Sequence, residues 1–161
     1  MRFGSIALVA ALALSGAEAQ AATTTTTFAV QMTITASCVI NSASTLNFGS
    51  SGVLSANIDQ TSTLQVQCTN TTPYNIGMNA GTGTGATVAV RKMTSGGNTI
   101  NYTLYSDSGR TTVWGNTVGT DTIAATGSGA AQSYTVYGRV PAQTTPTPAA
   151  YTDTITVTVT Y

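Results

Sequence analysis

Strict alternation of large apolar and small polar side chains is the feature that most constrains how this chain folds. Between residues 151 and 161, four apolar residues occupy alternate positions, namely Ile155, Val157, Val159 and Tyr161. A threonine fills every position between them. Successive side chains of an extended strand point to opposite faces, whereas apolar residues of an amphipathic helix recur every three or four positions. The pattern therefore predicts a strand with one face toward a core.

Threonine abundance extends this prediction to the rest of the chain. There are 34 threonines and 16 glycines among 161 residues, and no segment shows a sustained apolar repeat at helical spacing. Threonine is β-branched and fits pleated strands, while glycine favours turns. We expect an all-β antiparallel sandwich whose domain spans residues 38–161. Its further predicted strands are 38–40, 45–48, 53–58, 61–68, 74–78, 87–93, 99–105, 111–114 and 133–140.

The charge composition excludes several classes of function. Lysine plus arginine and aspartate plus glutamate number five each, and histidine is absent. Such a chain offers no cationic surface for nucleic acid and lacks the commonest general base and metal ligand. The glycine run at 81, 83 and 85 is interpreted as a hairpin loop, since no helix follows to bind phosphate. We predict no enzymatic activity, no cofactor and no metal site.

The first 21 residues are predicted to be a signal peptide. Arg2 precedes an apolar run over residues 6–14, and small residues around 17–21 offer a cleavage site. The alternative, a membrane anchor, needs about 20 apolar residues, and this run is well short of that length. We therefore expect an exported protein without a direct membrane anchor.

Two cysteines, Cys38 and Cys68, remain after export to an oxidising compartment. A disulfide between them would close a thirty-residue separation and stabilise the fold by roughly 3 to 4 kcal/mol on the chain-entropy model. The alternatives are two buried free thiols or a metal site. Two thiols without histidine form a poor zinc site.

Residues 22–37 form a predicted N-terminal arm with a second alternating segment. Its large apolar residues are Phe28, Val30, Met32 and Ile34. This segment could be an edge strand of its own sandwich. However, only residues 35–37 link it to Cys38, without glycine or proline, so a chain reversal there would be awkward. An exposed apolar strand is a liability for a monomer, but it suits donation to a groove in another subunit.

Aromatic residues leave a different kind of function open, that of a secreted carbohydrate-binding module. Aromatic rings at alternating strand positions are more typical of core and cross-strand packing than of sugar stacking. The residues concerned are Tyr102, Tyr105, Trp114, Tyr134, Tyr137 and Tyr151.

An ordered set of short motifs from Cys38 onward resembles the spore coat protein U domain, which is shared with subunits of archaic chaperone-usher pili. The chain departs from the family at Ala149-Ala150, where glycine is common before the Tyr-x-Asp element. The motifs are Cys38, Leu46-Asn47-Phe48-Gly49, Val66-Gln67-Cys68, Pro73-Tyr74-Asn75-Ile76, Gly81, Arg91-Lys92-Met93, Asn101-Tyr102-Thr103-Leu104-Tyr105, Trp114-Gly115, Val136-Tyr137-Gly138-Arg139 and Tyr151-Thr152-Asp153.

This resemblance implies an immunoglobulin-like sandwich that lacks its final strand. Its groove would be filled first by a periplasmic chaperone and then, at an outer-membrane usher, by the arm of an identical or related subunit. Carried onto this chain, it makes residues 28–34 the donated strand, Cys38 and Cys68 the disulfide, and Ile155, Val157, Val159 and Tyr161 one wall of the groove.

The expected function is that of a structural subunit of a secreted fibre, present in the periplasm during assembly and then at the cell surface. The alternative is a spore-coat or extracellular-matrix protein that uses the same domain.

Overall fold

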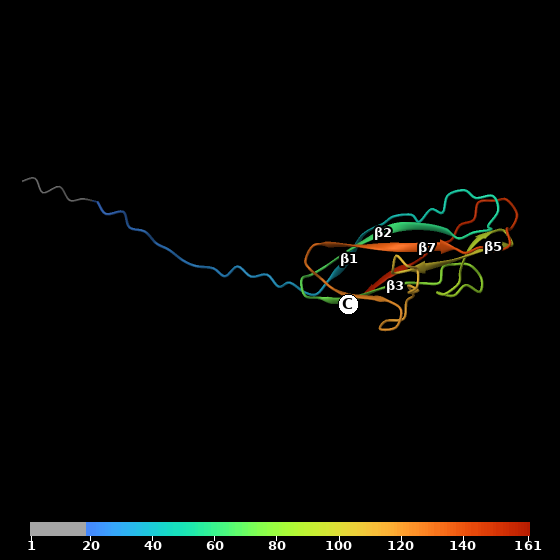
Figure 1. Cartoon of the computed structure of the whole chain (residues 1–161). Coiled ribbons are helices and arrows are strands. Elements are labelled where there is room, and N and C mark those ends of the chain that lie inside the picture. Colours follow the sequence, from blue (N-terminus) through green and yellow to red (C-terminus); the bar gives the residue numbers. More distant parts are fainter. Residues whose placement is uncertain (1–18) are drawn as a thin grey trace, which may run out of the picture. The chain divides into compact units, whose positions relative to one another are not determined.

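The computed structural model describes residues 19–161 (Figure 1), so residues 1–18 of the predicted signal peptide lie outside the described residues. The chain divides into two units, of which the first ends at Thr33 and the second spans Ile34–Tyr161. Residues 19–33 form neither helix nor strand, and their side chains are exposed. The division falls inside the predicted arm, residues 22–37, whose boundaries remain a prediction.

The second unit, here called the body, consists of antiparallel strands, and no helix occurs among residues 19–161. The all-β prediction is confirmed. The strands are β1 (Cys38–Ala43), β2 (Ile58–Cys68), β3 (Pro73–Met78), β4 (Arg91–Ser95), β5 (Asn98–Tyr105), β6 (Ile123–Thr126), β7 (Ala131–Val140) and β8 (Val157–Thr160).

These strands form two sheets (Figure 1). One has the order β1-β2-β7-β5-β4 and the other the order β6-β3-β8. The longest ladder joins β2 to β7, from Ile58 opposite Val140 to Gln67 opposite Ala131. Alternation fixes this register, because a slip of one residue would turn every apolar side chain of β2 away from the core.

Both sheets contribute to one hydrophobic core, so the body is a two-layer sandwich, as predicted. Leu64 and Val66 of β2 and Ile76 of β3 are buried in it. Trp114 is completely buried, and its indole N–H donates a 2.8 Å hydrogen bond to the carbonyl of Ile76. That bond satisfies the one polar group of a ring that otherwise contributes only apolar surface to the core.

Arg91 is an unexpected component of the interior. It begins β4, is completely buried, and donates hydrogen bonds to four backbone carbonyls: Asn79 (2.8 Å), Val88 (2.7 Å), Met78 (2.9 Å) and Trp114 (2.7 Å). Burial lowers the pKa of Arg91 from its ordinary value. The guanidinium is planar and carries several N–H donors at fixed angles. It therefore connects the end of β3 both to the segment that precedes β4 and to the segment that follows β5.

Several segments with strand-like alternation form no ladder. Residues 28–34 and 45–48 are not strands, and the predicted strand 151–161 is reduced to β8 and a bridge between Thr152 and Thr94. An alternating pattern favours an extended conformation, but a segment forms a ladder only where a neighbouring strand supplies hydrogen-bond partners. Conversely, β6 was not predicted, because its two central residues, Ala124 and Ala125, are both small and apolar and show no alternation of apolar and polar side chains.

Candidate strand-binding groove

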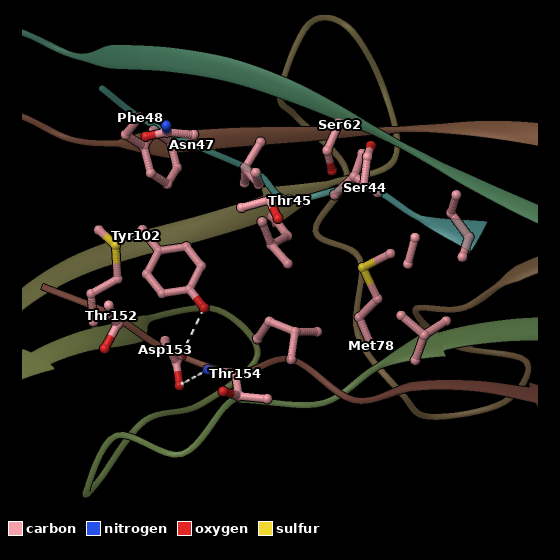
Figure 2. Close-up of a pocket in the computed structure, with 18 of the residues that line it drawn as sticks. Ser44, Thr45, Asn47, Phe48, Ser62, Met78, Tyr102, Thr152, Asp153 and Thr154 are labelled. Atoms are coloured by element: carbon pink, nitrogen blue, oxygen red, sulfur yellow. Dashed lines mark hydrogen bonds between the residues drawn. The ribbon is translucent and has the colours of Figure 1, made fainter. Parts of the chain in front are cut away.

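The body contains an apolar groove between two segments that form no ladder with each other (Figure 2). We call residues 43–48 the first wall and residues 151–157 the second wall. The cavity between them measures about 470 Å³. Its floor is formed by core side chains of both sheets: Leu64, Met78, Met93, Tyr102, Leu104 and Val136. A hollow of about 630 Å³ continues the groove toward residues 49–52 and 145–150. The two hollows share Leu46, Asn47, Phe48, Met93 and Tyr151.

The first wall leaves β1 and lies over β7. The Ser44 N–H donates to the carbonyl of Thr63 at 2.9 Å, and the Thr63 N–H donates to Ser44 Oγ at 2.8 Å. Beyond this point, Leu46 and Phe48 cover Gly138 of β7. A Cβ atom at residue 138 would overlap Leu46 and would lie 2.9 Å from Phe48 Cζ. Glycine at this position therefore allows the wall to approach the sheet.

The second wall is held by the carboxylate of Asp153. Its Oδ1 accepts hydrogen bonds from the Thr82 N–H (2.7 Å), the Thr82 hydroxyl (2.8 Å) and the Thr154 N–H (2.7 Å). Its Oδ2 accepts the Tyr102 hydroxyl at 2.7 Å (Figure 2). Burial alone would raise the pKa of Asp153, but these hydrogen bonds outweigh it and hold the pKa below its ordinary value. The carboxylate is therefore ionised at neutral pH.

Each edge strand beside the groove has one strand neighbour within the described residues. β1 pairs with β2, and β8 pairs with β3. In an antiparallel edge strand, alternate residues direct their backbone N–H and C=O groups away from the existing partner. These strands therefore offer backbone groups to a further strand.

The residues predicted to form one groove wall do not all lie at the groove. Ile155 and Val157 line it and pack against the core. Val159 packs against the core without lining either hollow, and Tyr161 is 60% exposed and lines neither.

The four residues predicted to be donated are exposed. The exposed fractions are 85% for Phe28, 84% for Val30, 86% for Met32 and 69% for Ile34. Among residues 19–161, no large apolar side chain is more exposed than the first three. Their apolar face is available for burial elsewhere.

The first strand of the body, β1, begins at a covalent link. Cys38 and Cys68 form a disulfide, as predicted, and they lie opposite each other in the ladder between β1 and β2. Just before it, the Ser37 N–H donates to Thr69 Oγ1 at 3.1 Å, and the Thr69 N–H donates to the Ser37 carbonyl at 2.9 Å. The start of β1 is thus joined to the end of β2 by two hydrogen bonds and a disulfide.

The structure does not gather the aromatic residues into one sugar-binding surface. Trp114 and Tyr102 are buried, whereas Tyr105 and Tyr137 are paired across β5 and β7 and are partly exposed. Within residues 19–161, no group of three potential metal ligands occurs. No helix in the same part of the chain has the length and hydropathy needed to cross a membrane.

The burial of Arg91, and the roles of Gly138 and of the contact between Tyr102 and Asp153 at the site, were not recognised from the sequence. A signal existed for Arg91, since a period of two places it on the same strand face as Met93, a groove residue. The other contacts join residues far apart in the chain, and no local pattern indicates them.

The body is similar to a chain in the crystal structure of the CsuC-CsuE chaperone-tip adhesion subunit pre-assembly complex from archaic chaperone-usher Csu pili of Acinetobacter baumannii. The TM-score is 0.57 at 24% sequence identity, and the match covers 80% of this chain and 40% of that chain. This likeness confirms the predicted β-sandwich fold, whereas the N-terminal donor strand stays a prediction.

The chain belongs to the Spore Coat Protein U domain family, whose model matches residues 24–158. It is also 33% identical to Protein U of Myxococcus xanthus over 167 residues, covering 94% of this chain and 93% of that protein. The family match begins within the predicted arm, includes β1 to β7 and ends within β8.

Proposed function

We propose that this protein is a structural subunit of a secreted surface fibre that polymerises by donor-strand complementation. In this mechanism, the alternating face of residues 28–34 from one copy enters the groove between the walls of another. One observation carries the proposal: a single chain combines an apolar groove beside edge strands with a separate, exposed segment of matching alternation. Backbone hydrogen bonds would supply affinity, and side chains at every second position would supply register.

The length of the segment and the apolar surface that it could bury follow from its sequence. From residue 28 to residue 34, a strand extends about 20 Å, at roughly 3.4 Å per residue. Burial of its four large apolar side chains would contribute on the order of 6 to 12 kcal/mol before the costs of ordering and association. A slip of one residue would instead point Ala29, Gln31 and Thr33 into the groove, so the register would be strongly specified.

The proposed partners are identical or related subunits, a periplasmic chaperone that covers the groove before assembly, and an outer-membrane usher. The similar fold within a chaperone-subunit complex supports the chaperone. The route would lead through the periplasm to the cell surface.

A second candidate function is that of a coat or extracellular-matrix protein assembled without an usher. The description of the family, Spore Coat Protein U domain, favours it. Neighbouring genes for a chaperone and an usher would support the fibre subunit, because such a subunit requires both.

Deletion of residues 22–36 tests the proposal. The shortened subunit retains its groove, so we expect it to accept a strand but not to donate one. Added to full-length protein, it should therefore cap growing chains. Gel electrophoresis without heating and electron microscopy would show shorter polymers than full-length protein gives under the same conditions. If the shortened protein fails to fold with its chaperone present, the arm belongs to its own core and the proposal is wrong.

A further inference from the structure

We infer that Tyr102 and Asp153 are positioning residues that set the spacing between the two groove walls before a strand arrives. The inference rests on the proposed function, because the wall spacing matters only if the groove accepts a strand. Tyr102 lies in the floor and contacts both walls (Figure 2). Its ring meets Phe48 of the first wall edge-to-face, with centroids 6.1 Å apart, and its hydroxyl donates to Asp153 of the second wall at 2.7 Å.

This bridge has little freedom to move. Tyr102 is only 4% exposed and lies in β5, opposite the buried Arg91 of β4. Burial, followed by its bond to Asp153, raises the pKa of Tyr102, so the hydroxyl remains a donor at physiological pH. Gly138 allows close approach of Phe48 on the other side. The ring and its hydroxyl thus link the first wall, the floor and the second wall in series.

Asp153 is also held by Gly81 and Thr82 of the loop after β3. Both hydrogen bonds from Thr82 reach the carboxylate, and Gly81 approaches it so closely that a Cβ there would overlap Asp153. Gly81 has a φ of +83°, a conformation that favours glycine. The loop after β3 therefore holds the second wall in place while Tyr102 links it to the first.

A fixed spacing has a consequence for binding. When no strand lies between them, contact between the two apolar walls is favourable in free energy, because it removes apolar surface from water. Walls already held at the bound spacing avoid the cost of reopening and ordering when a strand enters. Loss of the Tyr102 hydroxyl should therefore weaken strand capture by about tenfold, which corresponds to the lower end of what one hydrogen bond to a charged group contributes.

The test uses full-length protein in which Val30→Asp disables the arm of each molecule. A labelled peptide with the sequence of residues 22–37 is the probe, and fluorescence anisotropy measures its capture. Tyr102→Phe keeps the ring against Phe48 but removes the bond to Asp153. We expect about tenfold weaker capture by this variant, and a similar loss with Asp153→Asn.

Tyr74→Phe is the matched control. Tyr74 of β3 is 1% exposed, its hydroxyl donates to Gln132 at 3.1 Å, and it lines neither hollow. This variant also loses a buried hydroxyl, but we expect it to capture the peptide as the parent does. Thermal unfolding of both variants would show whether stability alone explains any difference.

The outcomes separate the two proposals. Equal capture by the parent and Tyr102→Phe would overturn the inference and leave donor-strand complementation intact. An equal loss in Tyr102→Phe and Tyr74→Phe would also overturn it, because general destabilisation would then be the cause. If the parent captures no peptide, the proposed function itself fails, and the inference fails with it.

Discussion

Residues 28–34 and strand β8 have the same alternating pattern but different surroundings. Val157 and Val159 of β8 are half-buried and pack against the core, whereas Val30 and Met32 are more than four-fifths exposed. The comparison shows that alternation specifies an extended strand and the composition of its two faces. It does not specify which sheet the strand completes, because that depends on a partner edge elsewhere.

Charge separates the same two regions. All eight charged side chains of residues 19–161 lie in the body, and residues 19–37 contain no titratable side chain. The stability of the body should therefore depend on pH and on its buried charge. The proposed binding of the arm should instead be sensitive to the addition of charge.

The largest expected effect comes from adding charge to the apolar face of the arm. Val30→Asp or Met32→Asp should abolish polymer formation, because the groove would have to bury an unpaired carboxylate. The body should still fold and bind its chaperone. Gel electrophoresis without heating would measure the polymers.

Gln31→Asp is the matched control, since residue 31 belongs to the opposite face and should tolerate the charge. Unchanged fibre length in electron micrographs of Val30→Asp would contradict the proposed role of the arm.

Removal of the buried guanidinium should have the next largest effect, this time on the body. Arg91→Ala leaves four carbonyls without their donor and should lower the free energy of unfolding by roughly 3 to 5 kcal/mol. Lys92→Ala removes one exposed 3.3 Å bond to the Thr84 carbonyl and should cost less than about 0.5 kcal/mol. Denaturant titration would measure both, and equal losses would show that Arg91 has no special structural role.

The smallest effect should appear at low pH. The pKa of Asp153 is lower in the folded body than its ordinary value, so its contribution to stability is complete above the ordinary pKa and is lost as the pH falls toward the folded pKa. The free energy of unfolding should therefore decrease below about pH 4. Asp59 and Asp107 also have lowered pKa values, so Asp153→Asn should reduce this decrease without removing it. An identical pH dependence in the parent and Asp153→Asn would contradict this role.

Most strands of the two sheets could be predicted from the sequence. The alternation of β-branched and other side chains that indicates a strand is visible within each short segment. The predicted segments 74–78 and 133–140 correspond to β3 (Pro73–Met78) and β7 (Ala131–Val140). The prediction of a strand over 45–48 was wrong, since this segment borders the groove and forms no ladder. Strand pairing depends on which other segment lies beside a strand in the folded protein. The local sequence of the strand does not contain this information.

The candidate site was predictable to a smaller extent. Ile155 and Val157 line the cavity between the two walls, but their role as a wall that accepts a strand stays a prediction. The bond from Tyr102 to Asp153 joins residues 51 positions apart, and that from Arg91 to Trp114 joins residues 23 positions apart. Such contacts follow from the folded topology, so periodicity within a window of ten residues cannot indicate them.

The disulfide lies where a pull on the arm would enter the body. If neighbouring subunits hold the arm, tension along a fibre passes through Ser37 into Cys38, the first residue of β1. There the Cys38–Cys68 bond takes the force directly to β2, which is paired with β7 over ten positions. The hydrogen bonds between β1 and β2 therefore cannot be pulled apart one by one from the arm end, and mechanical strength at this junction would depend on a covalent bond.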